Sequence, residues 1–368
     1  MNNYKNDSRV VLTLDAGGTN FVFSAIQGNN EIVKPVTLPS NGNNLTKCLD
    51  NIVAGFKTII KDCSSSPSAI SFAFPGPADY SNGIIGDLFN LPAFRGGIAL
   101  GPFLQEKFNL PVFINNDGDL FAYGEAMAGF LPFVNKKLEE AGSPKRFKNL
   151  FGITLGTGFG AGLVVNNNLY IGDNSSAAEI CLMRNKLNPV TNAEEGACIR
   201  AIKRFYSERA KISIEDSPSA KNIYEIGAGN IPGNNSAAIA AYSKLGESVG
   251  DSLAQAITLL DCLVVIGGGL SGASDLFMPS LIDEMNGKYD SSGNKQINRL
   301  VLKAYSLEDQ TEFNSFLKGD KKEITIPGST KTITYDPQKR IGVGITKLGT
   351  SKAVSIGAYI YALQKLDN

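Results

Sequence analysis

The chain has 368 residues, 43% of them hydrophobic, a length that suits two or three domains with sizeable cores. Lys and Arg number 35, as do Asp and Glu, and this balance gives no support for a nucleic-acid surface. Histidine is absent, which excludes a histidine base, a Ser-His-Asp triad and a histidine-ligated metal, and leaves proton transfer to carboxylates, Lys, Tyr or Cys.

The first predicted element is a buried strand at 10–14, followed by a glycine-containing turn and a second strand over about 20–27. Glycines in this turn can take positive φ and let a ligand approach the backbone. Their N–H groups and the Thr19 hydroxyl can donate to a phosphate, and the carboxylate before them could face a phosphate-bound metal. The alternative is an ordinary hairpin turn. The phosphate interpretation involves Asp15, Gly17, Gly18, Thr19 and Asn20.

The next 100 residues mix strands and helices in an α/β pattern. We predict strands at 31–38, 69–74 and 112–115, and helices at 44–62, 98–108 and from residue 117 to about 128. Asp117 follows a strand and begins a helix, so it emerges at the carboxyl end of a strand, where ligands gather in α/β sheets. The competing interpretation is that Asp117 only caps the helix, a role for which Asp119 is a second candidate.

Two further glycine turns follow. Strands at 150–155 and 161–165 flank one of them, and a strand at 263–266 followed by a helix at 274–285 flanks the other. One such turn is weak evidence, because glycines at strand ends also serve helix–sheet packing. Two Gly-Thr hairpins and one strand–glycine–helix junction, in this order, are much more specific for nucleotide phosphates. The residues concerned are Gly156, Thr157, Gly158, Gly267, Gly268 and Gly269.

The remaining chain is predicted to hold four helices and two insertions. The helices fall at 196–209, 219–227, 235–259 and 351–366, and the last is expected to pack back on the first lobe. One insertion covers 131–149. The other covers 286–350 and contains a likely hairpin whose strands, 323–326 and 332–335, flank Pro-Gly-Ser. This hairpin is interpreted as a surface arm, with an oligomer contact as the main functional alternative.

The turns and four further motifs resemble the ROK group of sugar kinases, within the actin/Hsp70/hexokinase-like ATPase superfamily. The additional matches are Phe74–Ala78, Asn90–Pro92, Ile114–Glu125 and Ser355–Ala358. The resemblance implies an α/β, two-lobed, actin-like ATPase (ribonuclease H-like) fold with its active site in the interlobe cleft. It places one lobe at 1–116, completed by the helix at 351–368, and the other at 117–350, with an insertion around 286–350.

The resemblance also implies the chemistry, an ATP-dependent phosphorylation of a hexose at its 6-hydroxyl, with glucose as the first choice. Asn116 and Asp117 would bind the sugar, with Asp117 as the base that accepts the hydroxyl proton. Asn90 and Glu179 would contact the sugar as well. Asp15 would bind Mg²⁺ through water, and the glycine turns would hold ATP.

The sugar pocket departs from the family pattern. Leu182 stands where a histidine would follow the glutamate, and the usual Cys/His zinc cluster keeps at most Cys198, with Arg200 in place of its final glutamate. Two thiols, those of Cys181 and Cys198, cannot fill a tetrahedral zinc site, so no zinc is expected. Alternatives are a kinase for N-acetylhexosamine, mannose or fructose, or a non-catalytic sugar or nucleotide sensor. A family repressor would need a DNA-binding domain before the first turn, where only fourteen residues stand.

Location and partners follow from composition and resemblance. Five cysteines without paired spacing favour reduced thiols in the cytoplasm. The chain has no signal-peptide core and no apolar run that could span a bilayer. We therefore expect a cytoplasmic homodimer that binds sugar and ATP, with neither nucleic acid nor membrane as a partner.

Overall fold

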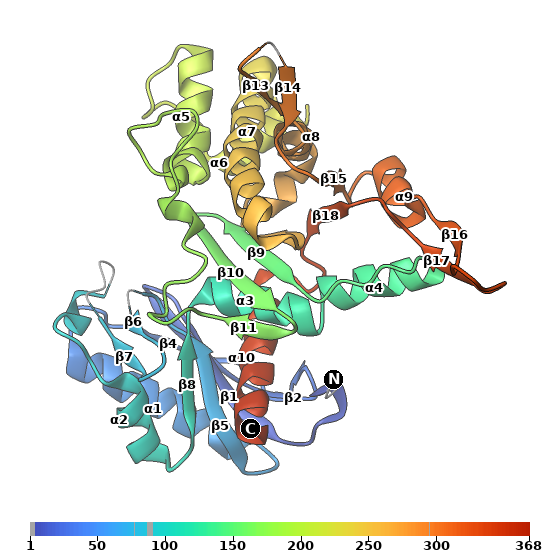
Figure 1. Ribbon diagram of the computed structural model, residues 1–368. Coiled ribbons are helices and arrows are strands. Elements are labelled where there is room, and N and C mark those ends of the chain that lie inside the picture. The colour runs from blue at the N-terminus through green and yellow to red at the C-terminus, as the bar shows by residue number, and fades with distance from the viewer. Residues whose placement is uncertain (1–3, 77, 87–90, 294) are drawn as a thin grey trace. The chain divides into compact units, whose positions relative to one another are not determined.

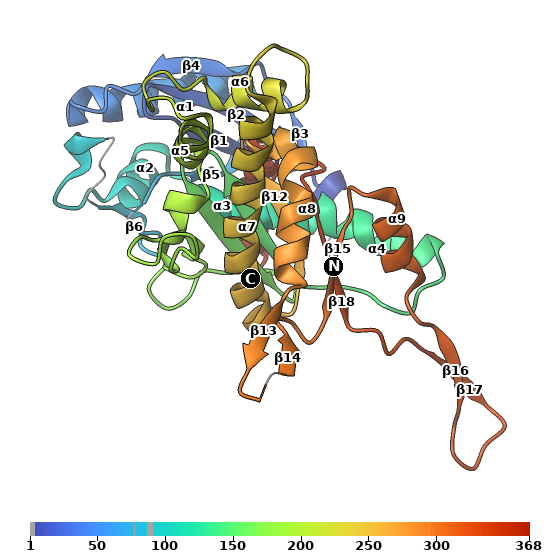
Figure 2. The same cartoon turned by 90° about the horizontal axis from the view of Figure 1, so that it is seen from above.

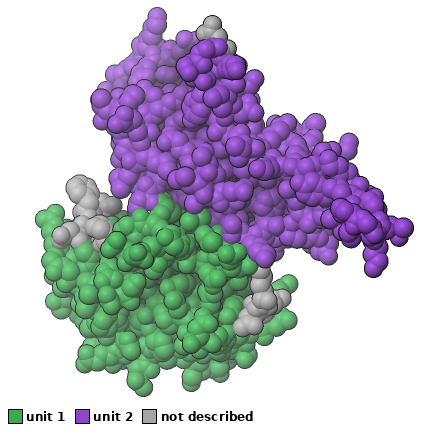
Figure 3. Space-filling model, in the orientation of Figure 1, with its two compact units in different colours: residues 1–129, 162–178, 348–368 green, residues 130–161, 179–347 purple. Residues whose placement is uncertain are grey.

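A computed structural model describes residues 4–76, 78–86, 91–293 and 295–368 (Figure 1). The chain divides into two compact units, each discontinuous in sequence (Figure 3). Unit 1 comprises residues 1–129, 162–178 and 348–368, and unit 2 comprises 130–161 and 179–347. The predicted lobe boundaries, at 116/117 and 350/351, stay a prediction; by compactness, residues 117–129 and 162–178 group with unit 1.

Unit 1 is built on a mixed sheet in the order β3-β2-β1-β5-β8, with β4 also paired to β2. β1 runs antiparallel to β2 and parallel to β5, and β5 runs parallel to β8. The strands are β1 (Val10–Ala16), β2 (Asn20–Gln27), β3 (Asn30–Glu31), β4 (Val36–Pro39), β5 (Pro67–Ala73) and β8 (Val112–Asn115), with a separate pair, β6 (Ala78–Asp79) and β7 (Ile84–Ile85).

Helices cover this sheet on both faces. α1 (Leu45–Asp62) and α2 (Leu100–Phe108) enclose one aromatic-rich core, and α3 (Asp117–Met127) and α10 (Thr350–Asp367) cover the other face. The α1 helix begins at Asn44, whose side chain accepts from the Lys47 N–H, and it buries residues spaced three or four apart. Phe56 meets Phe23 edge to face with ring centroids 5.2 Å apart. Each buried phenylalanine contributes about 1.5–3 kcal/mol.

The predicted strand at 31–38 is wrong as a continuous element. The structure has two short strands there, ending at Glu31 and beginning at Val36, because Pro35 between them has no N–H to donate to a ladder.

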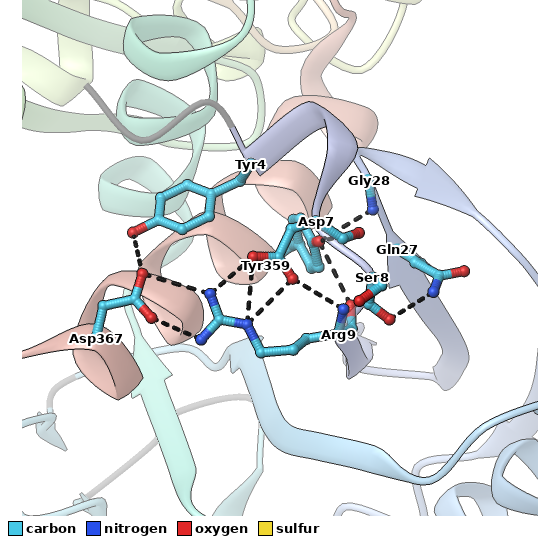
Figure 4. A network of polar contacts seen from close by, with 8 residues as sticks. All are labelled: Tyr4, Asp7, Ser8, Arg9, Gln27, Gly28, Tyr359 and Asp367. Carbon is cyan, nitrogen blue, oxygen red and sulfur yellow. Dashed lines mark hydrogen bonds and ion pairs between the residues drawn. The ribbon is translucent and has the colours of Figure 1, made fainter.

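The C-terminal helix α10 packs within unit 1, as predicted. Glycines let it cross α3 closely, because a Cβ at Gly124 or Gly357 would meet the backbone of Ala353 or Leu120. A polar network also fastens it to the N-terminal segment (Figure 4). Arg9 pairs with Asp7 at 2.7 Å and with Asp367 at 2.6 Å. The end of α10 is thus tied to the segment that leads into the central strand β1.

Unit 2 carries the strands β9 (Leu150–Leu155), β10 (Phe159–Val165), β12 (Leu263–Gly267), β15 (Lys303–Ser306) and β18 (Arg340–Ile345), in the order β10-β9-β12-β18-β15. The boundary between units falls within β10, and β11 (Asn168–Tyr170), which extends that edge, counts with unit 1. The unit's helices are α4 (Phe130–Glu140), α5 (Ile199–Ala210), α6 (Ala220–Gly227), α7 (Asn235–Leu260), α8 (Ser274–Met285) and α9 (Gln310–Lys318).

Two hairpins extend from unit 2. One consists of β13 (Lys288–Ser291) and β14 (Lys295–Asn298), and the other, β16 (Lys322–Thr325) and β17 (Thr332–Tyr335), projects as an arm (Figure 2). The second hairpin confirms the sequence prediction. The structure also shows that the range 286–350 contains β15 and β18, which are strands of the sheet. No helix in the described part of the chain has the length and apolar character to cross a bilayer.

Candidate active site

The first glycine turn joins β1 and β2 as predicted, with Asp15 opposite Val22 in the register. Neither Gly17 nor Gly18 has positive φ, so that expectation fails. Gly17 is needed for space instead, since a Cβ there would lie 2.9 Å from the Asn20 carbonyl oxygen.

Ser40 forms hydrogen bonds with the carbonyl groups of this first glycine turn. Its Oγ donates to the Gly18 carbonyl at 2.6 Å, and its N–H donates to the Thr19 carbonyl at 2.9 Å. In a trans peptide the carbonyl and the next N–H point in opposite directions. Holding these carbonyls therefore directs the N–H groups of Thr19 and Asn20 away from Ser40, as a phosphate-binding turn requires.

Asp117 follows β8, so it lies at the carboxyl end of a strand, as the sequence predicted. The N-cap of α3 is Asn116, whose Oδ1 accepts from the Gly118 N–H at 2.8 Å. Asp117 is the first helical residue, and its Oδ1 also accepts from this N–H, at 2.9 Å. Neither Asp117 nor Asp119 is thus the N-cap, and Asp119 is buried in the first turn.

Asp15 and Asp117 both lie in unit 1. Both side chains keep exposed surface, yet the surrounding protein raises the pKa of each carboxyl above its ordinary value. The Asp15 charge raises the pKa of Asp117 further, and backbone N–H bonds, chiefly from Gly118, oppose this. A carboxylate whose pKa is shifted upward is better suited to accept a proton near neutral pH.

A pocket of about 460 Å³ opens beside Asp15 in unit 1. Ser24, Glu31 and Lys352 contribute polar groups to its lining, and the Ser24 hydroxyl donates to Glu31 at 2.5 Å. Asp15 therefore faces a hollow with room for polar ligand atoms and solvent.

Unit 2 brings the two other glycine turns together. β9 and β12 run parallel with Thr154 opposite Gly267, and the Leu270 N–H donates to the Leu155 carbonyl at 3.0 Å. Gly268 has φ +85°, and a Cβ there would collide with the Leu155 backbone. Only glycine allows this approach. The strand–turn–strand and strand–glycine–helix junctions at Gly156–Gly158 and Gly267–Gly269 are thus confirmed as structural elements.

The remaining predicted site residues are distributed as follows. Glu179 precedes a short 3₁₀ helix (Ile180–Leu182) in unit 2, where its exposed carboxylate accepts a hydrogen bond from the Cys181 thiol at 3.4 Å. Burial and the neighbouring Glu179 raise the pKa of Cys181 to about 12. Asn90 lies outside the described residues.

The structure also bears on the metals. Among the described residues no three His, Cys, Asp or Glu side chains gather to hold a metal ion, and Cys198 is buried. The residues present do not fit a structural zinc. They are compatible with Mg²⁺, because this ion is commonly held by only one or two carboxylates together with substrate phosphates and water. Asp15 is suited to that role.

Sequence reasoning missed the role of two charged residues. Arg200, which the sequence placed at the final glutamate of the cluster motif, donates to the Thr157 carbonyl in the second glycine turn at 3.0 Å. Glu194 accepts from the Phe159 N–H of the same turn at 3.2 Å. The one sequence signal for these roles is that Glu194 precedes the predicted helix and Arg200 lies in its first turn, a spacing that allows an ion pair.

The α/β sheets, two strand-linked glycine turns and a strand–glycine–helix junction define a protein of the actin-like ATPase fold, the class that includes the ROK hexokinases. The chain belongs to the ROK family, whose profile matches residues 11–311.

The chain is similar to several known proteins, of which we report three. A crystal structure of glucokinase from Parabacteroides distasonis is 53% identical, covers 98% of this chain and 99% of its own, and superposes with a TM-score of 0.91. Glucokinase from Thermotoga maritima is 25% identical over 302 residues, which are 75% of this chain and 86% of the relative. The xylose repressor of Bacillus spizizenii is 27% identical over 52% of this chain, and the chain spans 48% of that relative.

Proposed function

We propose that this protein is an ATP-dependent hexose kinase that transfers the γ-phosphate to the 6-hydroxyl of glucose. The observation that carries the proposal is Asp117, a carboxylate with a raised pKa that follows β8 and is the first residue of α3, whose cap is supplied by Asn116. The 53% identity to a protein named glucokinase, over nearly the whole chain, supports the same activity.

In the proposed reaction Asp117 accepts the proton of the sugar 6-hydroxyl as its oxygen attacks the γ-phosphorus. The new bond is oxygen to γ-phosphorus, the broken bond is γ-phosphorus to the bridging oxygen, and ADP leaves with that oxygen. The transition state is loose, so alignment and charge neutralisation matter more than base strength. Donors from the turns at 17–20, 156–158 and 267–269 would supply neutralisation.

Mg²⁺, when bound, would neutralise phosphate charge, and Asp15 would hold it through water. Burial raises the pKa of Asp15, and a bound cation would offset this by favouring the ionised carboxylate. Asp15 would then also orient the phosphates toward Asp117.

The sugar contacts proposed are Asn90, Asn116, Asp117 and Glu179. The Asn116 Oδ1 already serves the helix cap, so its side-chain amide nitrogen is the group left to donate to a sugar hydroxyl. Glucose is proposed first, with mannose, fructose and N-acetylhexosamines as alternatives. A coupled assay of ADP release over a panel of these sugars tests the assignment, and ATP binding without any sugar-stimulated turnover would favour a sensor instead.

We further propose a homodimer in the cytoplasm. The five cysteines are free thiols, which suits a reducing compartment. The arm β16–β17 supports an association surface. Its paired Ile324 and Ile333 share one face with Tyr335, and all three side chains are exposed. A two-stranded hairpin is marginally stable alone, so an apolar face on it favours a partner.

A further inference from the structure

The carbonyl groups of the second glycine turn are held by the start of α5. The Ile199 N–H donates to the Gly156 carbonyl at 2.8 Å. The Arg200 Nη1 donates to the Thr157 carbonyl at 3.0 Å. Two successive carbonyls of the turn thus face the first two residues of one helix.

This fastening fixes where the N–H groups of the turn point. In a trans peptide the carbonyl oxygen and the following N–H lie on opposite sides of the chain. Anchoring the Gly156 and Thr157 carbonyls on α5 therefore directs the Thr157 and Gly158 N–H groups away from α5. Preorganised donors of this kind stabilise phosphate charge without rearranging during the reaction.

Glu194 completes the arrangement on the other side of the turn. Its Oε2 accepts from the Phe159 N–H at 3.2 Å, while its Oε1 pairs with Arg200 at 3.0 Å. A Cβ at Gly158 would lie 2.9 Å from Glu194 Oε2, so this carboxylate occupies the space that the glycine leaves. A side chain at position 158 would therefore have to displace the Glu194 carboxylate.

Arg200 is itself held in place. Its Nη2 contacts the carboxylates of both Glu194 and Glu195 at 3.0 Å, and Arg204, one helical turn later, pairs with Glu195 at 3.4 Å. The side chain of Arg200 is about half exposed. Exposed ion pairs contribute little to folding stability. The arrangement is therefore better suited to fix the direction of a loop than to stabilise the fold.

We infer that Arg200, with Glu194, is a positioning residue for phosphoryl transfer, holding the turn at 156–159 so that the Thr157 and Gly158 N–H groups face the phosphates of ATP. The inference rests on the proposed function, and it adds two residues that contact neither sugar nor nucleotide. It predicts that their loss weakens the use of ATP while leaving recognition of the sugar intact.

The test compares Arg200→Ala with Arg204→Ala. Arg204 lies on the same helix and shares the Glu195 partner, but among the described residues no hydrogen bond or ion pair joins it to the turn. The kcat/KM for ATP should fall about tenfold or more in Arg200→Ala, which is about 1.4 kcal/mol or more in the activation barrier. In Arg200→Ala the KM for glucose should change less than twofold and the melting temperature by only a few degrees. In Arg204→Ala the kcat/KM for ATP should change less than twofold. The kcat/KM for ATP of Arg200→Lys should lie between those of wild type and Arg200→Ala, because the lysine ammonium can still donate a hydrogen bond but cannot contact several acceptors in the planar geometry of a guanidinium.

Binding of a non-hydrolysable ATP analogue with Mg²⁺, measured by calorimetry without sugar, gives a second readout that needs no turnover. A loss of affinity in Arg200→Ala but not in Arg204→Ala supports the inference. Equal binding and equal kcat/KM for ATP in Arg200→Ala and wild type would overturn it. A wild-type protein that binds the analogue but phosphorylates no sugar would refute the proposed function and leave the positioning role to be judged on binding alone.

Discussion

Replacing Asp117 by asparagine removes one negative charge and keeps the shape of the side chain. The asparagine Oδ1 can still accept from the Gly118 N–H, and Asn116 still caps α3. If Asp117 accepts the sugar proton, kcat should fall about 10²- to 10⁴-fold, the usual range for general-base catalysis, or about 3–5 kcal/mol in the activation barrier.

The same substitution should leave folding stability unchanged or raise it, although it lowers turnover. Burial and the Asp15 charge raise the pKa of Asp117, so its ionised form is disfavoured in the folded protein. The folded state then binds the proton more tightly than the unfolded state, and ionisation above the folded pKa lowers stability. Asparagine removes this penalty, so the variant should melt at the same temperature as wild type or higher at neutral pH.

The assay pairs a coupled measurement of ADP release with thermal melting on the same preparations. Asp119→Asn is the control, because Asp119 lies in the same helical turn and the family resemblance gives it no role; its turnover per folded molecule should stay near wild type. The reasoning is refuted if Asp117→Asn keeps near wild-type turnover, or if Asp119→Asn is the variant that loses it.

Three further predictions test the rest of the account. The acid limb of kcat/KM, which reports the free enzyme, should lie above the ordinary aspartate pKa of 3.8, because the pKa of Asp117 is raised and the base must be ionised; a limb at or below 3.8 in a pH series would contradict this. Activity should be lost on chelation and restored by Mg²⁺, with no zinc retained; elemental analysis that finds one zinc per chain after dialysis against a weak chelator would show this to be wrong. Ile333→Lys should shift the protein toward monomer in analytical ultracentrifugation, since the charge falls on the apolar face of the arm, whereas Thr332→Lys on the opposite face should not; an unchanged dimer in both would remove the arm from the interface.

The sequence predicted the elements whose signals are local. A strand followed by a glycine turn, as at Leu150–Gly158, can be predicted from neighbouring residues alone, and the structure has the predicted turns. Asp117 was placed at a strand end for the same reason. The residues alone left the choice between a base and a cap open, because the cap depends on which of three neighbouring polar residues takes the N-cap position, and Asn116 takes it.

Errors arose where a local signal competed with tertiary context. A strand predicted through Pro35 ignored the missing N–H. The insertion predicted at 131–149 stays a prediction, and the structure adds that Phe130–Glu140 forms a helix whose Phe133 stacks on Phe313. Arg200 could not be assigned from sequence, because the carbonyl it contacts is 43 residues away.

The most direct test of the central claim is ADP release by the wild-type protein with Mg²⁺-ATP, measured with glucose, mannose, fructose and N-acetylglucosamine in parallel. The account predicts glucose-dependent ADP formation with glucose 6-phosphate as the product, and lower kcat/KM for the other sugars. ATP binding without sugar-stimulated ADP formation for any of them would contradict it.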